Sequence, residues 1–381
     1  MSFNAGVQTT LLTGPSHSTR TALNLGANLI EFMKYSFWIT LVLCTILLNS
    51  CDEENPHTPI AVVAAAEHLE LQFMHLERDL FEADFKNSSR VSQDLYQKYG
   101  AFWCAFVEND LQLAACTSDS VQALLYPFVV NSAILETHAA IGQVFRPEDF
   151  AQIEGALTEA FRKWASVYPD STMPRVVYYQ SGWNNNIYPM SGYLGIALDS
   201  YLGPDHPVTQ KLSTDIIPQY KKDDMRKDYI VPDAVKGWVA YTHRDLYQSK
   251  DLLHELLFYG KLMHMTRSLL PELPDTLLLN WSEKELQWAQ ANEWNTWKVV
   301  ANEDRLFDKK MSEVGRWFAQ GPFTGARDIP QDSSPQLGIW LGWQMVSQYM
   351  QSHPEVTLPQ LMADNDDLKI LAAYKPKRHK N

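Results

Sequence analysis

The chain has 381 residues, of which 45% are hydrophobic and 20% charged, and its formal net charge is −13. This composition can bury a substantial core, and the acidic balance argues against a nucleic-acid binder, which needs a basic surface. The sequence contains no run of eighteen or more apolar residues, which excludes a helical body embedded in a membrane. Its four cysteines are too few for a disulfide framework.

The first fifty residues have the pattern of a targeting signal. Residues 1–32 are polar and lack sustained apolar periodicity, whereas Met33 and Lys34 precede a short apolar run, 37–48, that ends in Leu48-Asn49-Ser50-Cys51. A basic start, a short apolar stretch and a small residue before a cysteine are typical of a bacterial lipoprotein signal peptide. The alternative is a short buried helix with an incidental cysteine, which leaves the position of the lysine unexplained.

This pattern predicts how the chain is divided. The segments are a dispensable extension at 1–32, the signal peptide at 33–50, an acidic tether at 51–60, a single body at 61–374 and a basic tail at 375–381. The Cys51 thiol is expected to receive the lipid. The protein would then be held at the cell membrane or the outer membrane by its lipid anchor, since several acyl chains bind a bilayer far more firmly than one.

Periodicity in the body predicts many helices and a small region of strands. Helical spacing is expected at 61–83, 91–107, 119–141 and 147–167, and again from Pro232 to the end. Between these regions, Arg175–Tyr179 and Tyr193–Leu198 have the β-branched and aromatic composition of strands, and the asparagines at 184–186 indicate a turn. The two strands are therefore expected to form a hairpin, and the expected fold class is α+β, predominantly helical.

Sequence motifs of common enzymes are absent. There is no glycine-rich nucleotide loop and no Gly-x-Ser-x-Gly elbow. Cys104 and Cys116 are too far apart in sequence for a typical zinc pair. In an oxidising envelope they could form a disulfide, and two buried thiols are the equal alternative. We expect no metal and no cofactor.

The segment that follows Asp251 begins like the helix of a zinc peptidase. Such helices carry His-Glu-x-x-His because ligands four residues apart point the same way. Here His254 and Glu255 are followed by Phe258 where the second histidine must be, so an active zinc peptidase is not expected. Ser249 is the expected N-cap of this helix.

The same helix is apolar on both sides and should be buried. Glu255 would then be a carboxylate among apolar side chains, which needs a partner or a proton. It lies either in a cleft or in the core, bonded to an arginine or a tyrosine. His264 is expected to be a hydrogen-bonded core histidine. The residues proposed for a cleft are His243, Glu255, Tyr259 and Lys261.

Tryptophans are frequent after residue 280. They are Trp281, Trp288, Trp294, Trp297, Trp317, Trp340 and Trp343. The heptad between the first two and the three-residue step between the last two favour packing between helices. Contact with a glycan or a protein partner is the alternative.

The body also resembles a known family, the gliding-motility lipoprotein GldB family, in a series of short segments. They are Leu194–Asp199, Tyr201–Gly203, Ile230–Asp233, Glu255–Lys261, Pro274–Leu278, Glu285–Trp288, Asn292–Glu293, Gly321–Phe323, Ser334–Pro335 and Gly338–Gln344. The lipobox fits as well, and the order of the segments is more specific than any one of them. After Ser334–Pro335 the family usually has Gly-Arg, whereas this chain has Gln336 and Leu337, so a role of that arginine would be lost or moved elsewhere.

The resemblance implies a membrane-anchored component needed for surface gliding, in an envelope where motility and protein secretion are linked, without known catalytic activity. The family more distantly resembles a group of zinc peptidases, in which the helix placed like 232–247 carries His-Glu-x-x-His and the next helix supplies a glutamate. Here the first helix has only His243, and Glu255 lies where the third ligand would be. The resemblance thus implies a zincin-like scaffold that lacks the metal.

We therefore expect a non-enzymatic lipoprotein of the gliding or secretion apparatus. Its expected partners are the envelope membrane, through the lipid on Cys51, and other proteins of the machinery, but not nucleic acid. The alternative is an envelope hydrolase, or a protein that binds glycans or peptides, with its site in the cleft near Glu255.

Overall fold

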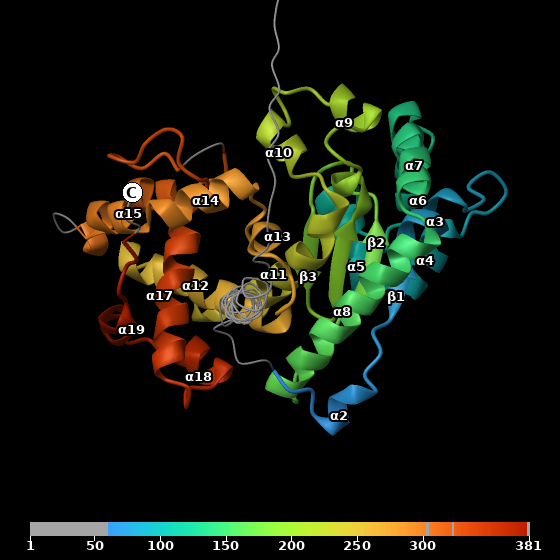
Figure 1. Cartoon of the computed structure of the whole chain (residues 1–381). Coiled ribbons are helices and arrows are strands. Elements are labelled where there is room, and N and C mark those ends of the chain that lie inside the picture. Colours follow the sequence, from blue (N-terminus) through green and yellow to red (C-terminus); the bar gives the residue numbers. More distant parts are fainter. Residues whose placement is uncertain (1–59, 302–304, 322–323, 379–381) are drawn as a thin grey trace, which may run out of the picture. The chain divides into compact units, whose positions relative to one another are not determined.

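A mixed sheet of four strands lies inside the helical body (Figure 1). The computed structural model describes residues 60–301, 305–321 and 324–378, all of which belong to one compact unit, His57–Asn381. The strands are β1 (Phe73–His75), β2 (Arg175–Tyr179), β3 (Ile187–Met190) and β4 (Tyr193–Ala197), in the order β1-β2-β4-β3. The predicted extension, signal peptide and nearly all of the tether lie outside the described residues.

The α+β class is confirmed, but the predicted hairpin between the two strands is wrong. Strands β2 and β4 pair in parallel, with Val176 opposite Leu194, and the hairpin is formed by β3 and β4. Strand β3 contains Pro189, which cannot donate to a ladder and lowers the strand signal, yet is tolerated on the edge strand. Because β3 occupies the antiparallel position beside β4, only the other edge of β4 is open to β2.

Both faces of the sheet are buried, which explains why β2 and β4 read as continuous apolar runs. Val176 and Tyr178 belong to a core with the long helices, while Val177 and Tyr179 belong to a second core on the opposite face. This alternation follows from the two-residue period of a strand.

Seven α-helices and a short π-helix precede β2. They are α2 (Ala64–Glu67), α3 (Leu76–Phe81), α4 (Val91–Tyr99), α5 (Ala101–Ala105), η1 (Phe106–Asp110), α6 (Val121–Val129), α7 (Ser132–Val144) and α8 (Pro147–Val167), counted within the described residues. The bounds predicted for α8 are confirmed. The continuous helix predicted at 61–83 is wrong, because β1 adds to the edge of the sheet between α2 and α3 and that tertiary pairing overrides the local spacing.

Breaks also divide the other predicted helices of this half. Gly100, with φ 54°, separates α4 from α5, and α6 and α7 meet at a bend of 70°. Among the described residues no single helix is long and apolar enough to cross a membrane, although α6 and α7 together pass that test by length and composition.

The second half is mostly helical, as predicted from Pro232 on, while its short helices before that residue were not predicted. Its elements are η2 (Leu198–Tyr201), α9 (Pro207–Lys211), α10 (Gln219–Asp223), η3 (Lys227–Tyr229), α11 (Ile230–Thr242), η4 (Arg244–Leu246), α12 (Leu252–Leu269), α13 (Asp275–Leu279), α14 (Glu283–Ala291), α15 (Glu293–Val300), η5 (Arg305–Phe307), α16 (Met311–Val314), η6 (Gly315–Trp317), α17 (Leu337–Ser352), α18 (Leu358–Ala363) and α19 (Asp367–Ala373).

Helices α12 and α17 approach each other closely. Two glycines permit this contact: a Cβ added at Gly260 would lie 2.3 Å from the backbone of Gly342, and one added at Gly342 would lie 1.8 Å from the Leu256 carbonyl oxygen. Every residue of α12 except Phe258 and Tyr259 is buried, which confirms the predicted burial. Its N-cap is Asp251, whose carboxylate accepts the His254 N–H at 3.0 Å, so the predicted cap at Ser249 is wrong by two residues.

Candidate functional site

A cavity of about 1140 Å³ lies beside the residues that directly follow β2 and β4. Open α/β sheets usually bind ligands outside the carboxyl ends of their parallel strands, and this volume is slightly above the range of about 300–1,000 Å³ that is usual for ligand sites. Its walls come from the loop after β2 and from α10, α11, α13 and α14, whose arrangement can be followed in Figure 1. The cavity is therefore the candidate site of this protein.

The loop after β2 is held in place by a buried carboxylate, Asp199. The backbone N–H groups of Ser181 and Trp183 donate to Asp199 at 3.0 and 2.8 Å. Trp183 has φ 61°, in the left-handed region that a bulky residue rarely adopts, so Asp199 stabilises a strained turn that presents Trp183 to the cavity. Burial raises the pKa of Asp199 to about 6, against the effect of these N–H donors.

Asp233 of α11 is the centre of a hydrogen-bond network in the cavity wall. Its two oxygens accept from the Tyr201 hydroxyl and the Asn280 amide, each at 3.0 Å. The Lys236 ammonium, one helical turn along α11, lies 3.0 Å from Asp233 and donates to Asn280 at 2.9 Å. The only lysine charge in this network is therefore already paired.

Asp224 follows α10 and faces the same cavity. Burial raises the pKa of Asp224 to about 7, and the negative charges of Asp233, Glu285 and Asp223 act in the same direction, while Lys236 opposes them. Glu285 caps α14: its carboxylate accepts from the Ser282 backbone N–H at 2.7 Å. The cavity thus contains a carboxyl group that is partly protonated near neutral pH.

The structure brings Glu255 and Tyr259 together, but not with the other predicted cleft residues. The Tyr247 hydroxyl donates to the Glu255 carboxylate at 2.7 Å, and Glu255 is only 3% exposed. The charge of Glu255 also helps to raise the pKa of Tyr259, whose main cause is burial. Glu255 is thus a buried carboxylate bonded to a tyrosine, as one of the two expected arrangements had it, but Tyr247 is 41% exposed and lies outside the core.

His243 and Lys261 have other partners. His243 forms hydrogen bonds with the Tyr168 hydroxyl at 2.9 Å and with the Val239 carbonyl at 2.8 Å, and burial lowers its pKa. Lys261 donates to the backbone carbonyl of Asp364, and burial lowers its pKa. None of the four residues lines the large cavity. That they form a ligand site stays a prediction.

The other histidines of α12 lie in the core. His254 forms a hydrogen bond with Asp367 of α19 at 3.0 Å, and Lys250 lies 3.1 Å from the same carboxylate. His264 is buried and forms a hydrogen bond with Ser347 of α17 at 3.3 Å, which confirms its predicted role.

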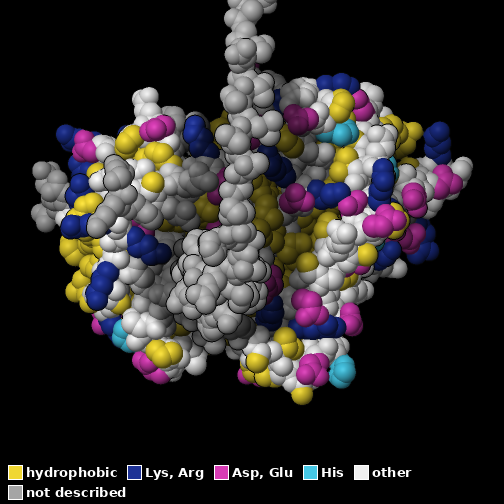
Figure 2. All heavy atoms as spheres, viewed as in Figure 1, with side chains coloured by type: hydrophobic (Ala, Val, Ile, Leu, Met, Phe, Trp, Pro, Cys, Tyr) yellow, Lys and Arg dark blue, Asp and Glu magenta, His cyan; other side chains and the backbone are white. Residues whose placement is uncertain are grey.

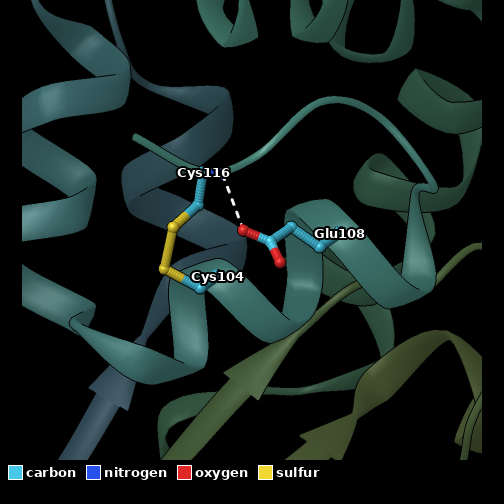
Figure 3. A group of neighbouring side chains, drawn as sticks. All are labelled: Cys104, Glu108 and Cys116. Atoms are coloured by element: carbon cyan, nitrogen blue, oxygen red, sulfur yellow. Dashed lines mark hydrogen bonds between the residues drawn. A yellow bond between two sulfur atoms is a disulfide. The ribbon is translucent and has the colours of Figure 1, made fainter. Parts of the chain in front are cut away.

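Cys104 and Cys116 form a disulfide (Figure 3), which decides between the two alternatives for this pair. The Glu108 carboxylate accepts the Cys116 N–H at 2.8 Å. Within the described ranges these are the only three His, Cys, Asp or Glu residues whose ligand atoms all lie within 4.8 Å of one another. Because the two sulfurs are bonded to each other, this group is no metal site.

The tryptophans lie mostly in the core, as the helical spacing favoured. Trp281, Trp317, Trp340 and Trp343 are buried, while Trp288, Trp294 and Trp297 are partly exposed. Trp281 also lines the cavity, which the spacing did not predict.

The cavity was not predicted from the sequence. Asp233 and Lys236 are three residues apart on one helix, which is a spacing typical of an ion pair. This spacing is visible in the sequence and could have indicated the pair. Asp224 and Asn280 carried no comparable signal, because their position in the wall depends on how α10 and α13 pack.

Comparison with known protein families gives a match over most of the chain. A family model described as gliding motility protein GldB matches residues 58–376. No curated protein and no solved structure matches the chain. The family resemblance seen in the sequence segments is thus confirmed, whereas the more distant likeness to zinc peptidases stays a prediction.

Proposed function

The chain belongs to the gliding motility protein GldB family, and from this premise we propose that it is a lipid-anchored part of the bacterial gliding and secretion apparatus that acts by contact with other proteins, without catalysis. The observation that carries the proposal is the match of the family model to residues 58–376, which is most of the chain. The family supplies the role in gliding. The anchor and the mode of action are our additions.

The proposed anchor is supported by the sequence before the body. A lysine, a short apolar run and the cysteine at position 51 follow one another in the order that a lipoprotein signal peptide requires. Lipid on Cys51 would leave the helical body in the aqueous layer beside the membrane, where it can reach other envelope proteins.

The proposed mode of action is supported by the partners of the zincin-like positions. Phe258 replaces the second histidine of the metal motif, and Glu255 accepts a hydrogen bond from Tyr247. The face seen in Figure 2 has acidic and basic side chains interspersed, a mixture that suits contact with proteins better than with nucleic acid. A hydrolytic role of Glu255 stays the alternative, and its test is given in the Discussion.

Deletion and complementation in the source bacterium test the proposal. We expect the deletion strain to stop gliding and a plasmid copy of the full chain to restore it. Cross-linking of the restored strain should recover envelope proteins of the machinery together with the chain. Normal gliding of the deletion strain would contradict the proposed role. Normal recovery of motility by a chain that cross-links to no other protein would contradict the proposed mode of action.

A further inference from the structure

The charges in the large cavity are not balanced by its own cations. Asp224 and Glu285 form no ion pair among the described residues, and the Lys236 ammonium is already bound by Asp233 and Asn280. The other basic residues of the lining, Lys221 and Arg226, are exposed, and Lys236 opposes the acidic groups around Asp224. A group that enters the cavity therefore meets an excess of carboxylates.

Three of these carboxylates cannot hold one metal ion together. In the part of the chain that the structure describes, no three carboxylates of the cavity bring their oxygens within 4.8 Å of one another. The cavity volume, about 1140 Å³, is also that of an organic molecule and not of an ion. The missing positive charge would therefore be carried by a larger ligand.

The walls suit such a ligand. Tyr220, Tyr229 and Trp281 line the cavity, and the partly exposed ring of Tyr220 can attract an organic cation, because aromatic faces attract such cations. Trp281 is 2% exposed, and its indole N–H has no hydrogen-bond partner in the protein, so an acceptor is also missing there. Buried polar groups of native proteins usually have a partner, from the protein, from water or from a ligand.

We propose that this cavity binds a primary ammonium group carried by an organic molecule, with Asp224 and Glu285 as its counter-charges. The group can come from the lysine side chain of a peptide or from a free diamine. The proposal goes beyond the role in gliding and does not depend on it, so each can fail without the other.

Calorimetric titration of the full chain, purified in detergent, tests the proposal. The probes are acetyl-Ala-Lys-Ala-amide, its norleucine analogue, which keeps the length but lacks the charge, and cadaverine. We expect the lysine peptide to bind at least about tenfold more tightly than the norleucine peptide. Tighter binding of the peptide than of cadaverine identifies a peptide source, and the reverse order identifies a free diamine.

The pH dependence provides a second readout. Asp224 shares its surroundings with Asp223, Asp233, Lys236 and Glu285. Because Asp224 loses its proton as the pH rises past about 7, the lysine peptide should bind more tightly at about pH 8 than at about pH 6.

Two variants complete the test. Asp224→Asn should weaken binding of the lysine peptide about tenfold and remove most of its pH dependence. Asp205→Asn, an exposed aspartate outside the cavity, should bind like the parent. Equal affinity for the lysine and norleucine peptides, or parent-like binding by a folded Asp224→Asn protein, would overturn the proposal. If chitotetraose, an uncharged sugar, binds and neither the lysine peptide nor cadaverine does, the proposal is overturned and the cavity is a glycan site.

Discussion

At the scale of single residues, the cavity wall changes how Asp224 titrates. Its pKa is raised from 3.8 to about 7, mainly by burial. Between these two pH values the folded protein keeps a proton that the unfolded chain has released. The free energy of unfolding should therefore fall as the pH rises through this window. The stabilisation that comes from the proton on Asp224 is fully lost above about pH 7.

The variant Asp224→Asn cannot release this proton. We expect its melting temperature to exceed that of the parent at about pH 8 and to approach it near pH 4, where both side chains are neutral. Thermal unfolding followed by circular dichroism across this range measures the effect. The exposed control Asp205→Asn should follow the parent at every pH. Parallel curves for Asp224→Asn and the parent would show that burial does not perturb this carboxyl group.

A substitution of Glu255 distinguishes a structural role of its carboxylate from a catalytic role. Glu255→Gln keeps an oxygen that can accept the Tyr247 hydroxyl, so we expect it to lower the free energy of unfolding by about 1–3 kcal/mol. Gliding should then decline only as far as the amount of folded protein does. Stability, cellular level and gliding speed should be measured together, with the exposed Glu272→Gln as control. A stable, abundant Glu255→Gln protein that cannot support gliding would favour the hydrolase or binding-cleft alternative.

At the scale of elements, the contact between α12 and α17 leaves no room for a methyl group. Gly260→Ala would place a Cβ 2.3 Å from the Gly342 backbone, which cannot move away like a flexible side chain. We expect a loss of about 3 kcal/mol or more in the free energy of unfolding, measured by urea denaturation. Gly155→Ala is the matched control, because Gly155 is an exposed helical glycine with open space around it. It should stabilise α8 by about 0.5–1 kcal/mol.

The disulfide closes the segment between α5 and α6. Its two cysteines are 12 residues apart, and cross-linking a loop of this length stabilises a folded chain by about 3 kcal/mol. Reduction of the parent should therefore lower its melting temperature to that of the double variant Cys104→Ala/Cys116→Ala. The double variant itself should not respond to the reductant. An unchanged melting temperature of the parent on complete reduction would contradict this stabilising role.

The elements also show how far the sequence predicts the fold. Helix α8 is long, amphipathic and begins with Pro147 and two acidic residues, so local signals alone define its bounds. Strands β1 and β3 are only three and four residues long, and β3 contains Pro189. Their strand conformation comes from pairing with β2 and β4, which are far away in sequence or lie across a turn, so periodicity cannot find them.

At the scale of the whole molecule, Cys51 is expected to decide where the body is located. Cys51→Ala removes the thiol that would receive the lipid. We expect metabolic labelling with a fatty-acid analogue to disappear and the protein to leave the membrane fraction. A chain that starts at Met33 is the control, since its signal peptide is complete and it should be labelled like the parent. Undiminished labelling of Cys51→Ala would refute the anchor.

The sequence by itself determined the features that depend on residues close together in the chain. They are the helix-rich class, the buried nature of α12 and the family segments, each a matter of local composition, period or order, whereas the targeting pattern before Cys51 stays a prediction. Even the two alternatives for Glu255 followed from its apolar neighbours on one helix.

Only the tertiary structure decided which residues meet. The partner of Glu255, the pairing of Cys104 with Cys116 and the parallel order of β2 and β4 all join segments through packing. The cavity is the clearest case: Asp224, Asp233 and Glu285 come from three different helical regions. Burial in the cavity wall, with the repulsion among these acidic groups, raises the pKa of Asp224, and both causes exist only because the fold brings these segments together.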